Sequence, residues 1–114
     1  MDAIKGKMME FYVCEEMQKL RDWLDSQQIP WKDVSSDYKD MIPEPYNTWM
    51  CRTHFEYKDN FYSVIHGYGS YGGLSLLHGE TLNHNLLEMM VGNHEPIGYL
   101  TAEEVEEYVL GTKE

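Results

Sequence analysis

Two neighbouring segments constrain the fold of this chain more than any other feature. Residues 49–57 and 61–67 are rich in aromatic and β-branched side chains, and only Lys58, Asp59 and Asn60 separate them. This pattern predicts two antiparallel strands joined by a tight turn. If Asp59 and Asn60 form a two-residue turn, the strands pair so that Thr53 lies opposite His66.

This register places a core-like set of side chains on one face of the hairpin and a mostly polar set on the other. The first set is Trp49, Cys51, Thr53, Phe55, Tyr57, Tyr62, Val64 and His66. The second set is Arg52, His54, Glu56, Lys58 and Ser63, together with Phe61 and Ile65. An antiparallel sheet that is covered on one side shows this segregation. A slip of one residue would scramble it, so the segregation supports the register.

Residues 3–28 are predicted to form a long N-terminal helix that ends before Pro30, because the residue before a proline is disfavoured in the helical region. One apolar stripe recurs at helical spacing and consists of Met9, Val13, Met17, Leu20 and Leu24. A second stripe, Ile4, Met8 and Phe11, lies nearly opposite the first. It needs a cover, which is either the C-terminal helix or a second copy of the chain.

The remaining chain contains shorter elements. Residues 29–34 are expected to form a short strand and residues 35–47 an irregular connector with two prolines. Residues 74–91 fit strand or helix equally, since periodicity does not decide for short apolar runs. Within them we favour a third strand at residues 86–91, because Gly92 and Asn93 end that apolar run sharply.

The C-terminal segment has clear signals for a short helix. Thr101 and Glu104 have the spacing of a capping box, and Gly111 is a natural stop. The face that should be buried consists of Ala102, Val105 and Val109. The expected fold is therefore α+β, with a long N-terminal helix packed on a small antiparallel sheet and a short C-terminal helix. At 114 residues the chain is expected to form a single domain.

The charge of the chain limits its partners. The formal net charge is −11, which disfavours direct binding to nucleic acid or to an anionic membrane and favours a basic protein surface. The plainer interpretation is that the charge keeps the protein soluble, and the most acidic stretch, 103–107, is then the solvated face of a helix. With no signal sequence and only Cys14 and Cys51, the chain is expected to be cytoplasmic, with free thiols.

The glycine-rich segment 67–73 is the most distinctive local motif. Its spacing, Gly67-x-Gly69-x-x-Gly72, matches a dinucleotide fingerprint, but no capped helix is expected to follow it. We therefore interpret the glycines as turn residues with positive φ. The segment also carries the residues of a candidate interface, namely Tyr68, Ser70 and Tyr71, since tyrosine is favoured at protein interfaces. Ile4, Met8 and Phe11 form a second candidate interface.

No catalytic constellation is apparent, so the chain is not expected to be an enzyme or to carry a cofactor. His78, His84 and Glu88 are weak candidates for a metal site, and their spacing fits no zinc pattern. His66 is expected to be a hydrogen-bonded core residue. Acidic neighbours should raise the pKa of the Cys14 thiol, and Cys51 lies on the core-like face, so both cysteines are expected to be inert.

Three stretches carry a resemblance. They are Thr53-x-Phe55 followed by the run 62–73, then 86–90, then Pro-x-Gly-Tyr-Leu-Thr-Ala-Glu-Glu-Val at 96–105. Together they resemble small uncharacterised phage and prophage proteins of Gram-positive bacteria. The resemblance spans residues 53–109 and implies a mobile-element accessory protein without implying an activity or a site. We therefore expect a non-enzymatic, macromolecule-binding accessory protein, with a small metal- or ligand-binding protein or a structural subunit of a larger assembly as alternatives.

Overall fold

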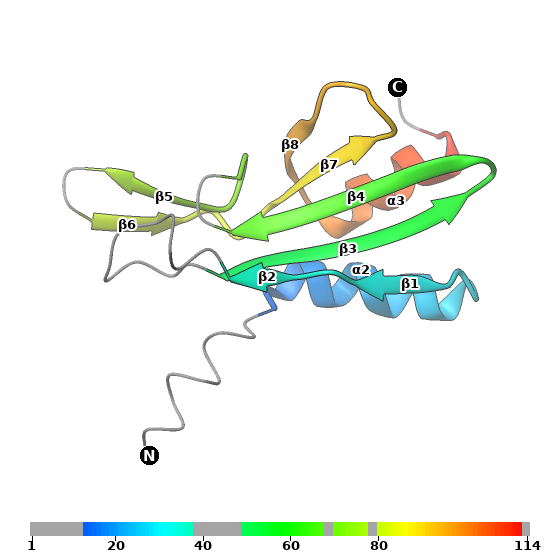
Figure 1. Cartoon of the computed structure of the whole chain (residues 1–114), viewed down its shortest axis with the longest axis horizontal. Coiled ribbons are helices and arrows are strands. Elements are labelled where there is room, and N and C mark those ends of the chain that lie inside the picture. The colour runs from blue at the N-terminus through cyan, green and yellow to red at the C-terminus, as the bar shows by residue number, and fades with distance from the viewer. Residues whose placement is uncertain (1–12, 38–48, 68–69, 78–79, 113–114) are drawn as a thin grey trace, which may run out of the picture.

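The computed structural model describes residues 13–37, 49–67, 70–77 and 80–112, and it shows an antiparallel sheet with two helices on one face (Figure 1). The helices are α2 (Glu15–Ser26) and α3 (Ala102–Leu110). The strands of the main sheet are β1 (Trp31–Asp33), β2 (Ser36–Asp37), β3 (Trp49–Tyr57), β4 (Asn60–Gly67), β7 (Leu87–Val91) and β8 (Ile97–Leu100). The expected α+β class is confirmed.

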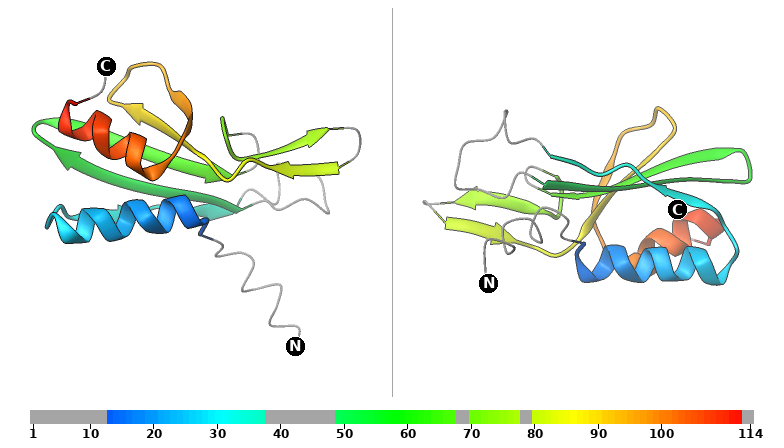
Figure 2. Two further views of the ribbon diagram at one scale, coloured as in Figure 1. Left: turned by 180° about the vertical axis from the view of Figure 1, so that it is seen from behind. Right: turned by 60° about the horizontal axis from the view of Figure 1, so that its bottom comes forward.

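Within the described residues, the main sheet has the strand order β1-β3-β4-β7-β8, and β2 pairs with β3 beyond the end of β1. A separate two-stranded hairpin is formed by β5 (Leu74–Leu77) and β6 (Glu80–Asn83). It extends from one end of the main sheet in both views of Figure 2. The strand predicted for residues 29–34 is confirmed in part, because β1 covers only its middle, Trp31–Asp33. The connector predicted for residues 35–47 was partly wrong, because its first residues pair with β3 as β2.

The β3–β4 hairpin has a different register from the predicted one. Tyr57 pairs with Asn60 and Thr53 with Val64, so the turn consists of Lys58 and Asp59 and the prediction was wrong by two residues. Both turn residues have positive φ, 51° and 70°, as a two-residue hairpin turn of the I′ type requires. A shift by two residues keeps every side chain on its face. The predicted core-like face is therefore confirmed for its buried members, Cys51, Thr53, Phe55, Tyr62, Val64 and His66.

This turn offers a test of the register. Replacing Lys58 with Asn and Asp59 with Gly should raise the free energy of unfolding by about 1 kcal/mol, because these residues adopt positive φ with little strain. Chemical denaturation measures the change. Glu95→Gly, in an exposed loop without positive φ, is the control and should lower stability. A loss of stability in the turn variant would contradict the observed register.

Helix α2 covers 12 residues of the helix predicted for residues 3–28. Its apolar stripe is confirmed at Met17, Leu20 and Leu24, which are completely buried, and Val13 packs against the same cluster. Residues 3–12 of the predicted helix lie outside the described residues, including Met9 and the second stripe of Ile4, Met8 and Phe11. The predicted bounds were wrong where the structure describes them, because residues 13–14 precede the helix and residues 27–28 follow it as a turn, with Gln28 at a φ of 61°.

Helix α3 begins and ends as its sequence indicates. The hydroxyl of Thr101 accepts a hydrogen bond from the Glu104 amide, and the Glu104 carboxylate accepts one from the Thr101 amide, which completes the capping box. Gly111 follows in the left-handed conformation at φ 81°. A contact that the sequence did not suggest joins the helices, since the Ala102 amide donates to Glu16 Oε1 of α2 at 2.7 Å.

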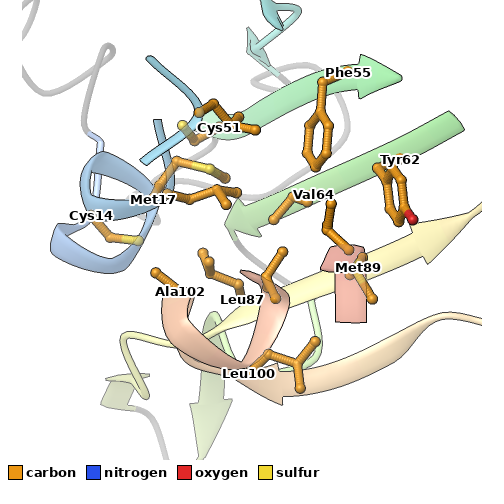
Figure 3. Close-up of a cluster of buried hydrophobic side chains, with 14 of the residues drawn as sticks. Cys14, Met17, Cys51, Phe55, Tyr62, Val64, Leu87, Met89, Leu100 and Ala102 are labelled. Carbon is orange, nitrogen blue, oxygen red and sulfur yellow. The ribbon is translucent and has the colours of Figure 1, made fainter. Parts of the chain in front are cut away.

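The core lies between the sheet and the two helices. Figure 3 shows Met17 of α2, Val64 of β4 and Leu87 of β7 in one cluster of buried side chains. Residues 87–91 form a central strand next to β4, so the strand that we favoured for residues 86–91 is confirmed. No helix in the described part of the chain is long and apolar enough to cross a membrane.

Candidate protein-binding site

Three exposed aromatic side chains lie on segments whose backbones meet beside the glycine-rich segment. Tyr71 and Tyr99 are 54% and 57% exposed, and the ring of His84 meets that of Tyr99 edge-on with centroids 5.7 Å apart. We call Tyr71, His84 and Tyr99 the aromatic patch. Large aromatic side chains usually bury most of their surface, so two tyrosines more than half exposed on neighbouring segments are a feature that folding alone does not explain.

Backbone hydrogen bonds fix the segments that carry the aromatic patch. The Tyr99 amide donates to the Tyr71 carbonyl at 3.1 Å, and the Tyr71 amide donates to Glu88 Oε1 at 2.7 Å. The His84 amide donates to the Gly73 carbonyl at 3.2 Å. The patch is therefore assembled from three separate parts of the chain on backbone that is held at each of them.

Close packing at Gly98 brings the two tyrosines together. A Cβ at Gly98 would collide with the Cβ of Tyr71, so only glycine allows β8 to approach the loop this closely. Gly72 is needed for another reason, because its φ is +103°. The expectation of positive φ throughout the loop was wrong for Gly67 and Gly73, and Gly69 lies outside the described residues.

Tyr99 has an unusual backbone conformation for a large residue. Its φ is 60°, in the left-handed region that glycine and asparagine favour. Such a conformation costs on the order of 1–3 kcal/mol and persists only where the surroundings enforce it. Strain of this kind concentrates at functional sites, so it marks Tyr99 as a candidate binding residue.

The glycine segment lacks the structure that a dinucleotide site requires. Strand β5 follows Gly72 and Gly73, whereas the fingerprint requires a helix whose N-terminus faces the pyrophosphate.

Ser70, one of the candidate interface residues, is half-buried, and its hydroxyl donates to the Gly67 carbonyl at 2.9 Å. Its role is to close the loop. Tyr71 is placed at the surface as expected, and Tyr68 lies outside the described residues.

The candidate metal ligands that the structure describes, His84 and Glu88, are not arranged as a metal site. His78 lies outside the described residues, Glu88 accepts the Tyr71 amide, and the ring of His84 packs on Tyr99. Within residues 13–37, 49–67, 70–77 and 80–112, no three His, Cys, Asp or Glu side chains are grouped as metal ligands. His84 is thus a member of the aromatic patch, and the carboxylate of Glu88 holds the backbone of Tyr71.

Both cysteines are free and buried. Burial raises the pKa of the Cys14 thiol to about 11 and raises the pKa of the Cys51 thiol as well. The acidic neighbours that the sequence suggested as the cause act only weakly on Cys14, since Glu16 has the smallest of the contributing effects. Thiols with raised pKa are poor nucleophiles, which agrees with the expectation that both are inert.

His66 is buried in the core, as expected from the sequence, and its Nδ1 lies 2.8 Å from the Leu86 carbonyl oxygen. Its cross-strand neighbour is Cys51 rather than Thr53, because of the corrected register. Burial lowers the pKa of the His66 imidazole below its ordinary value of 6.5.

The buried imidazole makes stability depend on pH. The unfolded chain binds a proton at His66 near pH 6.5 and the folded chain does so only at lower pH, so stability falls as pH drops below 6.5 and levels off below the folded-state pKa. His66→Gln should flatten this slope, as followed by urea denaturation between pH 7 and about 5. Burial and nearby Arg52 and Lys32 also lower the pKa of His54, so part of the slope remains. The exposed control, Asn93→Gln, exchanges one amide for another and should keep the full slope, and equal slopes in both variants would contradict this account.

Arg21 is a buried residue that the sequence reasoning missed. Its side chain lies beneath the sheet, where Nε donates to Oγ1 of Thr53 at 2.8 Å and the guanidinium stacks 4.7 Å from the Trp31 ring centroid. An ion pair at 3.4 Å links it to Asp33. The sequence did contain a signal for the burial of Arg21, because position 21 is four residues after Met17 and three before Leu24, in the middle of the buried stripe.

No family model matches the sequence, and the searches of curated proteins and of solved structures find no significant match. The function is therefore inferred from the geometry and charge of the molecule itself.

Proposed function

We propose that this protein is a non-enzymatic module that binds another protein through the aromatic patch. The observation that supports this most strongly is Tyr99, a tyrosine more than half exposed on backbone held at a φ of 60°. Glycine at this position would avoid the strain, so the tyrosine side chain has a role that offsets it.

The chemistry of the patch suits protein recognition. Tyrosine combines a large apolar ring with a polar hydroxyl and loses little conformational entropy on binding, which makes it a frequent anchor at interfaces. The hydrogen bonds that hold Tyr71 and Tyr99 before any partner arrives reduce the entropy lost on association.

The net charge of −11 favours a partner with a basic surface over nucleic acid. A cytoplasmic accessory protein of a phage or mobile element, which the sequence resemblance implies, fits such a role. The alternative of a metal-binding protein has less support, because the carboxylate of Glu88 already accepts the Tyr71 amide.

The test compares three tagged proteins in pull-downs from a nuclease-treated host lysate. These are the wild type, the double variant Tyr71→Ser/Tyr99→Ser, and the control Leu110→Ser, which changes a side chain 49% exposed at the end of α3. We expect a stoichiometric partner with the wild type and the control that is reduced at least tenfold with the double variant. A partner retained equally by all three, or no partner with any, would reject the proposal.

A further inference from the structure

The main sheet presents its second face away from the helices, as Figure 2 shows. By the pairing register, the side chains on this open face are Lys32, Met50, Arg52, His54, Glu56, Phe61, Ser63, Ile65, Glu88 and Met90, and of these Met50 is buried. Phe61 is 41% exposed and Met90 37% exposed. Exposed apolar side chains among charged ones are typical of an interaction surface.

The charge of the open face differs from that of the rest of the molecule. Among the residues that the structure describes, Lys32 and Arg52 balance Glu56 and Glu88 there, so these side chains sum to a formal charge of zero on a chain whose net charge is −11. Eight of the 20 acidic residues lie on the helices, and they are Glu15, Glu16, Asp22 and Asp25 on α2 and Glu103, Glu104, Glu106 and Glu107 on α3. Two copies of this chain therefore repel each other less when they meet at the open face than when they meet at the helices.

The order of the strands makes the open face self-complementary. Arg52 of β3, Ile65 of β4 and Glu88 of β7 lie in one row across the sheet. A twofold axis parallel to β4, halfway between two stacked sheets, exchanges the positions of β3 and β7. Arg52 of each copy then lies over Glu88 of the other, and Ile65 meets its own symmetry mate.

We infer that a second copy of this chain packs against the open face about this axis, with two reciprocal Arg52–Glu88 ion pairs around a centre of Ile65 and with Met90 of each copy over His54 of the other. A hollow of about 240 Å³ lies at that centre, lined by Arg52, Ser63, Ile65, Glu88 and Met90. The apolar side chains of the second copy fill it. Glu88 also accepts the Tyr71 amide at 2.7 Å, so the contact borders the aromatic patch of each copy.

Charge reversal tests the pairing directly. By analytical ultracentrifugation, the wild type should dimerise between low micromolar and about 1 mM protein. Arg52→Glu places two like charges opposite each other at both pairs, and so does Glu88→Arg, so each variant alone should dimerise about tenfold or more weakly. An equimolar mixture should recover a heterodimer, because both pairs are then complementary. A wild type that stays monomeric throughout, or single variants that dimerise like the wild type, would overturn the inference.

A second measurement covers the risk that Glu88→Arg disturbs the loop by removing the acceptor of the Tyr71 amide. Ser63 of β4 lies along the proposed axis and Lys32 of β1 lies at the sheet edge. A bismaleimide that spans about 10 Å, the distance between packed sheets, should join two Ser63→Cys chains and leave Lys32→Cys largely unlinked. The native cysteines are buried and unreactive. Equal linking at both positions, or none at Ser63→Cys, would reject this geometry.

Discussion

Leu87→Ala is expected to lower the free energy of unfolding by about 2–5 kcal/mol. Leu87 is completely buried in β7, and it lies in the cluster between the sheet and the helices shown in Figure 3. Truncating it removes apolar contacts and leaves a cavity that rigid neighbours on β4 and α3 fill only in part. A domain of this size has a total stability of about 5–15 kcal/mol, so this single change removes a large share of it.

Equilibrium urea denaturation measures this effect. The matched control is Leu110→Ala, the same substitution at a side chain 49% exposed, which should change stability by less than about 0.5 kcal/mol. Equal effects at the two positions would show that Leu87 does not lie in the core and would contradict the packing of β7 against the helices.

Arg21→Ala is expected to lower the free energy of unfolding by about 2–4 kcal/mol. The variant loses the hydrogen bond to Thr53, a residue that is itself completely buried, and the packing of the guanidinium on Trp31. It also loses the bond to the Arg52 carbonyl oxygen, 3.3 Å from the guanidinium. Asp33 contributes less, because its side chain is 53% exposed and solvent screens the pair.

Arg21→Met separates packing from polar contacts, since methionine fills most of the same volume without donating hydrogen bonds. Arg21→Met should lower the free energy of unfolding by about half as much as Arg21→Ala, because an apolar replacement partly offsets a removed buried charge. The exposed control, Lys19→Ala, should cost less than about 0.5 kcal/mol. If Arg21→Ala were no worse than this control, the buried network would contribute nothing to stability.

The acidic side chains of α3 affect the free energy of unfolding less than the buried network of Arg21 does. Partial burial raises the pKa of Glu106, and the charges of Glu103 and Glu107 act in the same direction. Like charges on neighbouring turns destabilise a helix slightly, and salt screens them. Repulsion among Glu103, Glu106 and Glu107 therefore offsets part of the stabilisation that Glu104 gives α3 through the capping box.

Local signals predicted the elements that local physics determines. The capping box of Thr101 and Glu104 defined the start of α3, and alternation of side chains identified the buried face of β3 and β4. The register failed because alternation repeats every two residues, so pairings that differ by two residues satisfy it equally. Only the backbone conformation of Lys58 and Asp59 distinguishes them.

The aromatic patch lay beyond sequence reasoning for a different reason. Tyr71 was singled out from its loop, but Tyr99 and His84 join it only because Gly98 allows β8 to approach Tyr71 closely. That approach depends on the order of strands in the sheet, which no local pattern encodes. The strain at Tyr99 likewise follows from its tertiary surroundings rather than from its neighbours in sequence.

Tyr99→Gly tests most directly the claim that the aromatic patch is a strained binding surface. Glycine adopts the observed φ of 60° freely, so the variant should be as stable as the wild type or more stable by about 0.5–1 kcal/mol. Recovery of the partner in the pull-down should nevertheless fall at least tenfold. A variant that loses more than about 1 kcal/mol of stability and still retains its partner would show that Tyr99 serves folding, and it would contradict the account.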